Sequence, residues 1–192
     1  QQLRSQVALI PQDPFLFSLT IRNNLTYDEP DRELPPIEHA AQLAELLDAI
    51  EEFPDGMETI VGERGITLSG GQKQRATLAR GLIRDARILA MDDCFSSVDT
   101  RTEERILGRL KEVRQGRTTL LISHRVSTAR HADRIFVMEG GQILESGTHA
   151  ELIAKGGYYA DLEAVQSNQD QDRQRKAALL RNLDIDVRVV NG

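Results

Sequence analysis

Apolar and polar positions along the chain form two kinds of pattern that together predict a mixed α/β protein. Short apolar runs bounded by polar residues, proline or glycine are typical of strands buried in a sheet. Such runs occur at residues 7–10, 87–91 and 118–123. Two further runs, at residues 134–138 and 142–145, are separated by Gly140 and Gly141, which predicts a strand pair joined by a turn.

Longer segments repeat their apolar residues at the three- and four-residue spacing of a helix. We expect one amphipathic helix over residues 37–53, preceded by a linker of prolines and acids at residues 28–36. Two capping boxes, in which Ser or Thr is followed three residues later by Gln or Glu, predict helix starts at Ser69 and Thr148. A further helix should begin near Asp99.

The alternation of strands and helices after residue 87 implies right-handed crossovers and a mainly parallel sheet. We therefore expect a partial α/β domain over residues 1–167, with a helical subdomain at about residues 20–85 and the remaining core at about residues 86–167. Residues 168–192 form a polar tail, for which we favour disorder. Alternating apolar residues near its end leave a late edge strand as the other interpretation.

Composition narrows the classes of function. Of the 192 residues, 40% are hydrophobic, and no apolar run approaches the roughly 18 residues of a membrane span. The N-terminal residues are polar and show no signal-peptide pattern. The net charge of −6 argues against a nucleic-acid or membrane-surface binder. Cys94 is the single cysteine, so an internal disulfide framework is excluded and a reducing compartment is indicated.

Two segments carry candidate chemistry. Ser69, Gly70, Gly71 and Gln72 open a predicted helix, where backbone N–H groups and the helix dipole can hold a phosphate. A second segment is the apolar run that ends in Asp92 and Asp93. In an open α/β sheet, ligands bind at the carboxyl ends of strands, so this pair of carboxylates should face a crevice.

These residues resemble the motifs of the ATP-binding cassette (ABC) family. LSGGQ is similar to the family's signature motif, and Asp92 stands where the first acid of the Walker B motif organises Mg²⁺. In the same order as in the family, Gln12 resembles the Q-loop glutamine, Asp99 ends a D-loop-like SSVD, and His124 resembles the H-loop histidine. The resemblance implies a RecA-like ABC ATPase core with an inserted α-helical signature subdomain.

The resemblance also implies cofactors, partners and site residues. Mg-ATP would bind between two head-to-tail cassettes, with Gln12, Asp92, Asp93 and His124 at the chain's own nucleotide and Gln12 and Asp92 near the metal. Asp93 would be the catalytic base, aided by His124 and Gln12. The residues that would face the nucleotide of the second cassette are Ser69, Gly70, Gly71, Gln72 and Asp99.

Two further segments resemble the corresponding segments of exporters, one group within the family. These are QDPFLF, which includes Gln12, and VGERG, which includes Glu63 and is similar to the loop that touches transmembrane domains. The domain would then lie at the cytoplasmic face of a membrane. Two classes remain as alternatives: a soluble ABC ATPase of DNA repair or translation, and a non-catalytic interaction module that only donates its signature to a partner.

The sequence departs from the family at two places. No lysine follows a glycine, so the phosphate-binding Walker A loop is absent, and we expect an N-terminally incomplete domain that is inactive alone. A protein that naturally lacks the loop is the alternative. Asp93 stands where the family has glutamate, which resembles the degenerate site of heterodimeric exporters. We therefore favour a heterodimer over a slow homodimer.

Overall fold

The computed structural model describes residues 5–62 and 65–168. The chain divides into two compact units, Gln1–His131 and Ala132–Gly192. Among the described residues, no helix combines the length and apolar character needed to cross a membrane.

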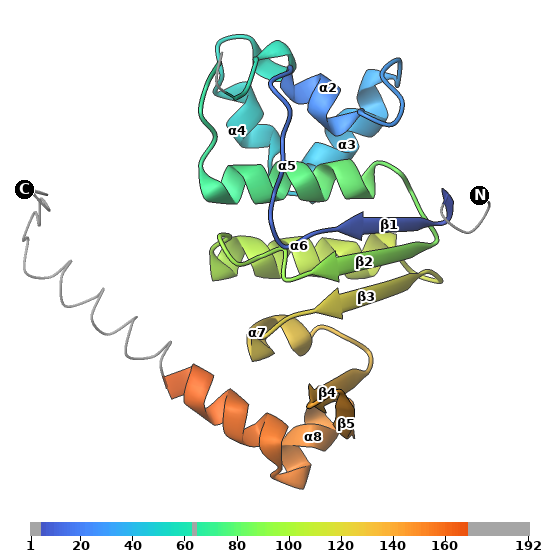
Figure 1. The fold of residues 1–192 in the computed structure, drawn as a ribbon, viewed down its shortest axis with the longest axis vertical. Helices are drawn as coiled ribbons and strands as arrows, with labels where there is room; N and C mark the ends of the chain where they lie inside the picture. Colours follow the sequence, from blue (N-terminus) through green and yellow to red (C-terminus); the bar gives the residue numbers. More distant parts are fainter. Residues whose placement is uncertain (1–4, 63–64, 169–192) are drawn as a thin grey trace, which may run out of the picture. The chain divides into compact units, whose positions relative to one another are not determined.

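A parallel sheet forms the centre of the first unit (Figure 1). Its three strands, β1 (Val7–Ile10), β2 (Ile88–Asp92) and β3 (Thr118–Ile122), lie in the order β1-β2-β3. The long segment between β1 and β2 is mostly helical, and α6 (Thr100–Val113) forms the crossover from β2 to β3. The predicted fold class, a parallel α/β core with an inserted helical segment, is therefore confirmed.

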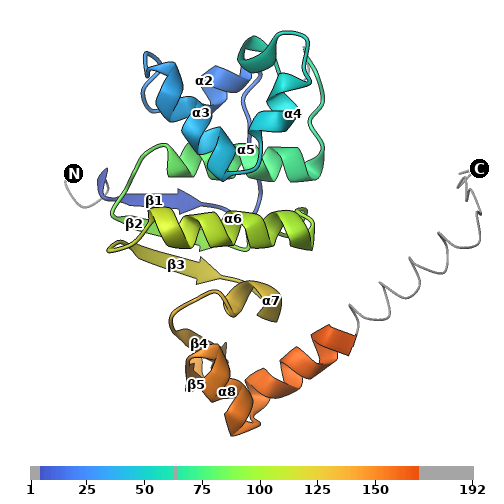
Figure 2. The same cartoon turned by 180° about the vertical axis from the view of Figure 1, so that it is seen from behind.

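Within the part of the chain that the structure describes, one face of this sheet is buried. Ala8, Ile10, Leu89 and Met91 point into the core, which includes the apolar sides of α5 (Gly70–Leu82) and α6. Figure 2 shows α6 running across the sheet. At Gly81 of α5 a Cβ atom would lie 2.5 Å from Ile10, so this glycine permits the close approach of helix and strand.

The other face carries exposed apolar side chains. Leu9 is 64% exposed, Leu120 is 55% and Ile122 is 50%. The prediction of buried strands is therefore confirmed for one face, whereas within the described residues the other face is exposed at β1 and β3. An apolar strand reads the same in a sequence whether its second face is covered by the same chain or by other polypeptide.

The helical segment contains α2 (Ile21–Leu25), α3 (Leu34–Leu43), α4 (Leu47–Glu51) and the 3-10 turn η1 (Gly56–Glu58). In Figure 1, α5 lies between these elements and the sheet. The single helix expected over residues 37–53 is wrong, because two helices occupy that stretch. Two of the three prolines in the segment assigned to a linker, Pro35 and Pro36, lie in the first turn of α3, where a missing N–H costs nothing.

Glu45 causes the break between α3 and α4. It adopts a positive φ of 55°, which ends the first helix. Its carboxylate binds two arginines of α6, with 2.9 Å to Arg105 Nε and 2.6 Å to Arg109 Nη1. The helical segment is thereby fastened to α6 by an ion-pair cluster in which Glu45 is 12% exposed.

The second unit contains a hairpin of β4 (Ile135–Glu139) and β5 (Gln142–Gly147), followed by α8 (His149–Lys155) and a helical stretch over residues 158–168. The predicted antiparallel pair with its Gly140-Gly141 turn is confirmed. So is the capping box of Thr148 and Glu151 at the start of α8. The expected polar tail and the late edge strand lie outside the described residues.

Candidate functional site

The carboxyl edge of the sheet brings together four predicted site residues. Asp92 is the last residue of β2 and pairs in register with Ile122, the last residue of β3. His124 follows two residues later, and Gln12 follows the end of β1 by the same distance. Because the strands are parallel, these residues and Asp93 lie at one edge, where ligands of α/β sheets bind. We call Gln12, Asp92, Asp93 and His124 the sheet-edge group.

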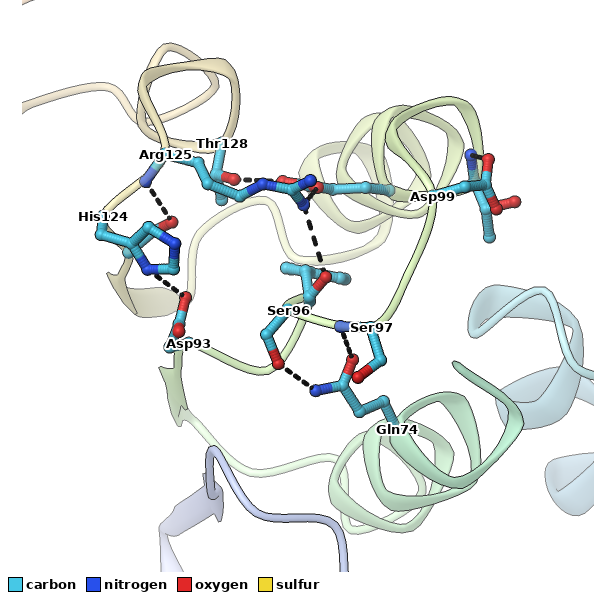
Figure 3. Close-up of polar contacts among 12 residues, drawn as sticks. Gln74, Asp93, Ser96, Ser97, Asp99, His124, Arg125 and Thr128 are labelled. Atoms are coloured by element: carbon cyan, nitrogen blue, oxygen red, sulfur yellow. Dashed lines mark hydrogen bonds and ion pairs between the residues drawn. The ribbon is translucent and has the colours of Figure 1, made fainter. Parts of the chain in front are cut away.

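Asp93 and His124 form a direct pair within this group (Figure 3). Asp93 Oδ1 lies 3.1 Å from His124 Nδ1, and the two side chains are 14% and 70% exposed. The backbone N–H of Asp93 donates to Ile122 O at 2.9 Å, and Asp93 has a positive φ of 41°. A carboxylate in this position orients the imidazole and fixes which ring nitrogen carries a proton.

The signature residues form the capped start of α5. The Gln72 N–H donates to Ser69 Oγ at 3.2 Å, and the Ser69 N–H donates to Gln72 Oε1 at 2.9 Å. The predicted capping box is therefore confirmed. It leaves the N–H groups of the glycines at the positive end of a 13-residue helix, a suitable place for an anion.

The same helix start packs against the D-loop segment. A Cβ atom on Gly71 would lie 2.8 Å from the backbone oxygen of Ser97, and one on Gly70 would lie 3.4 Å from Ser97 Cβ. Gln74, one turn into α5, bonds to both Ser96 and Ser97 (Figure 3). We call Ser69–Gln72 together with Ser96–Asp99 the signature–D-loop surface.

Asp99 caps α6. Its Oδ1 accepts from the Thr102 N–H at 3.0 Å. Hydrogen bonds from the backbone and side chain of Thr102 lower the pKa of Asp99 below its usual value. Asp99 therefore has a structural role at the end of the D-loop, in addition to its predicted contact with nucleotide.

Sequence reasoning missed a buried carboxylate behind the sheet edge. Glu103 of α6 is 1% exposed, and its Oε2 lies 2.5 Å from Arg125 Nη1 while its other oxygen accepts from the Thr128 hydroxyl. Burial raises the pKa of Glu103. Arg125 directly follows His124 and also donates to the Phe95 carbonyl at 3.4 Å, so it links the H-loop to the start of the D-loop.

Sequence reasoning also missed Gln74, although the sequence contains a signal for both Glu103 and Gln74. Glu103 lies on the apolar stripe of its helix, in line with Ile106, Leu107 and Leu110. Gln74 likewise lies on the buried side of α5. A charged or amide side chain on an apolar stripe indicates a buried polar partner, because burial without one is costly.

A third missed contact joins α5 to the segment after Gln12. Arg80 Nη2 donates to the Phe15 carbonyl, and Arg80 Nε donates to the Asn24 carbonyl, both at 2.8 Å. Asn24 is buried and bonds the backbone of Phe17 through both ends of its amide. The Q-loop region is thus tied to the signature helix.

The donor set at the sheet edge suits a magnesium ion that is shared with a phosphate ligand. Asp92 and Gln12 supply oxygen atoms, which Mg²⁺ prefers. Among residues 5–62 and 65–168, no three His, Cys, Asp or Glu side chains converge to hold a metal alone. Mg²⁺ typically uses one or two carboxylates and completes its shell with phosphate and water.

Comparison with known proteins identifies the family. The combination of a parallel sheet with acids at its edge and a glycine-started helix packed on the next loop is typical of phosphate-binding α/β proteins. The model of the ABC transporter family matches residues 1–96. The chain therefore belongs to the ABC transporter family.

Similar proteins are exporters and their relatives. The chain is 47% identical over 164 residues to the uncharacterized ABC transporter ATP-binding protein YknU of Bacillus subtilis, which covers 85% of this chain and 28% of that protein. It is 45% identical over 169 residues to an ATP-dependent lipid A-core flippase of Alkalilimnicola ehrlichii, and the match covers 88% of this chain and 29% of the flippase. The solved structure of a bacterial Atm1-family ABC exporter with ATP bound superposes with a TM-score of 0.80 at 41% identity, covering 85% of this chain and 29% of that one. The chain spans less than a third of the length of these relatives.

Proposed function

We propose that the chain is part of the ATP-binding cassette of an ABC exporter, which couples the binding and hydrolysis of Mg-ATP to transport across a membrane. The observation that carries this proposal is the contact of the LSGGQ helix start with Ser97, in a unit whose sheet edge carries Asp92, Asp93 and His124. Both halves of a shared nucleotide site are thus represented in one chain.

The sheet-edge group acts on the chain's own nucleotide. Asp92 and Gln12 would hold the magnesium ion, which would neutralise phosphate charge. Asp93 accepts the proton of the attacking water, and His124 donates a hydrogen bond to the terminal phosphate. The Asp93–His124 distance of 3.1 Å supports this assignment because the carboxylate can hold the imidazole in place.

The signature–D-loop surface acts on the nucleotide of a second cassette. Ser69, Gly70, Gly71 and Gln72 offer the start of α5 to the terminal phosphate, and Asp99 lies at the end of the adjoining D-loop. The second cassette is a different chain in our proposal. Asp93 is one methylene shorter than glutamate, and a misplacement of about 1 Å can cost about 10²-fold in rate, or about 2.7 kcal/mol.

The main phosphate grip comes from polypeptide outside this chain. None of its lysines follows a glycine, so the Lys of a Walker A loop is missing. The exposed apolar face of the sheet, with Leu9, Leu120 and Ile122, supports the proposal that further polypeptide packs there. On this basis the chain alone is inactive as an ATPase.

Transmembrane domains dock beside the Q-loop region, at the cytoplasmic face of the membrane. A groove of about 380 Å³ is lined by residues 14–16, 61–62 and 67–68 and by Lys73 of the signature helix. Phe15 is 61% exposed and its carbonyl is bonded to Arg80 of the signature helix, which gives a route from the groove to the nucleotide sites. Glu63, the predicted contact, lies outside the described residues.

The test uses the full-length protein assembled with its natural partner. We expect Mg-dependent ATP hydrolysis that falls strongly when the acid of the partner's Walker B motif is changed, and that falls little for Asp93→Asn. Asp93→Glu should raise the turnover. If neither Asp93→Glu nor the change in the partner alters the rate, the asymmetric site is wrong.

A second measurement addresses the missing phosphate grip. Calorimetry on the chain alone should detect no micromolar binding of Mg-ATP, because no lysine in this sequence takes the Walker A position. Tight binding with turnover would contradict the proposal and would require another phosphate grip. The full-length protein is the matched control and should bind.

A further inference from the structure

Gln74 connects the signature helix to the D-loop through both ends of its side-chain amide (Figure 3). Its Nε2 donates to Ser96 Oγ at 2.6 Å, and its Oε1 accepts from the Ser97 backbone N–H at 2.7 Å. The residue is only 3% exposed. A buried amide is stable only when its donors and acceptors are satisfied, so these bonds fix Gln74 and the D-loop relative to each other.

The first turn of the same helix touches the same serine. Gly70 and Gly71 leave no side chain between α5 and Ser97, which allows the close contacts described above. The D-loop is therefore held against two successive turns of α5: by shape at the glycines and by hydrogen bonds at Gln74.

We infer that Gln74 is a positioning residue, which makes the signature motif and the D-loop one rigid surface toward the nucleotide of the second cassette. This inference rests on the proposed function, in which both segments face that nucleotide. Without the amide of Gln74, the Ser97 N–H loses its acceptor and the D-loop can shift along α5. Small shifts of groups that contact a reacting phosphate are costly in rate.

Gln74 holds the D-loop through its polar amide group rather than through its bulk. Methionine has a similar length and packs well in a core, but it offers neither the donor for Ser96 nor the strong acceptor for Ser97. Gln74→Met therefore removes both bonds and keeps the volume. Thr77 provides a matched control, since it is a buried polar residue one turn later, and its hydroxyl donates to Lys73 O of its own helix at 3.0 Å.

The first experiment measures amide hydrogen exchange in the full-length protein. Gln74→Met should make exchange at Ser97 about tenfold faster, because one hydrogen bond is lost. Thr77→Val should leave this rate unchanged. If exchange at Ser97 is the same in Gln74→Met and in the wild type, the inference is overturned. This result does not depend on ATP hydrolysis, so it stands even if the proposed function fails.

The second experiment measures steady-state ATP hydrolysis by the full-length protein with its natural partner. Gln74→Met should lower kcat by about tenfold or more, with the KM for ATP changed by less than about threefold. The double variant that combines Gln74→Met with Ser96→Ala should have the same kcat as Gln74→Met alone. The reason is that Ser96→Ala removes the Gln74–Ser96 hydrogen bond, which Gln74→Met has already removed.

Three results in this assay would overturn the inference. The first is a kcat of Gln74→Met equal to that of the wild type, and the second is an equal fall in kcat for Thr77→Val. The third is a fall in kcat of the double variant that equals the product of the falls in the two single variants. A wild-type protein that hydrolyses no ATP is a different outcome. It would contradict the proposed function, whereas the exchange measurement would still decide whether Gln74 holds the D-loop.

Discussion

The sheet-edge group and the signature–D-loop surface are held in place in different ways. The sheet-edge residues follow the ends of strands, and the pair of Asp93 and His124 leaves His124 70% exposed. The signature–D-loop surface is fixed by the capping box of α5, by glycine contacts with Ser97 and by the buried Gln74. The surface that we assign to a partner's nucleotide is thus already assembled within this chain. The group that we assign to its own nucleotide is open and suited to be completed by other polypeptide.

Separating the signature helix from the D-loop should have the largest effect on function. Gly71→Ala places a Cβ atom 2.8 Å from the backbone oxygen of Ser97, so the backbone has to shift. We expect ATP turnover of the assembled full-length protein to fall by about 10²-fold, as for a displacement of about 1 Å. Steady-state hydrolysis measures this effect.

Gly70→Ala is the matched variant for that experiment. Its Cβ atom would lie 3.4 Å from Ser97 Cβ, an ordinary contact, so the loss of turnover should be much smaller. If both variants lost the same amount of ATP turnover, the close approach of Gly71 to Ser97 would not explain the effect of Gly71→Ala.

The next prediction concerns the carboxylate that supports the sheet-edge group from behind. Glu103→Gln removes the charge that binds Arg125, the residue after His124. We expect the free energy of unfolding to fall by about 2 kcal/mol, the range for a hydrogen bond to a charged group. Urea unfolding measures it. Glu104→Gln removes an exposed pair with Arg130 and should change stability by less than about 0.5 kcal/mol. A similar loss in both variants would contradict a supporting role for Glu103.

The cap of α6 gives a smaller, pH-dependent effect. Hydrogen bonds from Thr102 lower the pKa of Asp99 in the folded state, so its contribution to stability is present above the unfolded pKa of about 3.9. That contribution is lost as the pH falls through the folded pKa, because the unfolded state then binds more protons. Asp99→Asn keeps a capping side chain without a charge. The difference in unfolding free energy between wild type and Asp99→Asn should therefore be constant above about pH 5 and change below about pH 4. A constant difference down to pH 3 would contradict this origin.

The last prediction concerns the reactivity of Cys94, which lies in the segment that joins the sheet-edge group to the D-loop. Cys94 lies between Asp93 and Phe95, is 2% exposed, and burial raises the pKa of its thiol to about 12. We expect no labelling by iodoacetamide at pH 8 on the timescale on which the urea-unfolded chain reacts fully. Labelling at the unfolded rate would show that this segment opens, which would contradict a fixed connection between the sheet-edge group and the D-loop.

Features that depend on neighbouring residues were predictable from the sequence. The capping box at Ser69 and Gln72, the acids at the end of β2 and the Gly140-Gly141 turn are local patterns. Each has a local physical cause, such as satisfied N–H groups at a helix start or a positive φ at glycine. The parallel sheet followed from the strand–helix alternation.

Features that depend on distant contacts were not predictable in the same way. The pairing of Asp93 with His124 requires the register of β2 and β3, and the break at Glu45 is stabilised by Arg105 and Arg109 of α6. A pattern of apolar residues in one segment contains no information on such partners. Glu103 and Gln74 differ from these, because a polar residue on the apolar stripe of a helix is a local signal of a buried polar partner, although that signal does not name the partner.

The exposed face of the sheet has a practical consequence for work with the chain. Leu9, Leu120 and Ile122 present apolar side chains on the same face of the sheet, and β1 and β3 are edge strands of the described sheet. Such faces drive self-association in concentrated solution. Light scattering on the purified chain should therefore report oligomers whose amount grows with protein concentration. If further polypeptide packs on this face, as we propose, coexpression with it should keep the chain monodisperse.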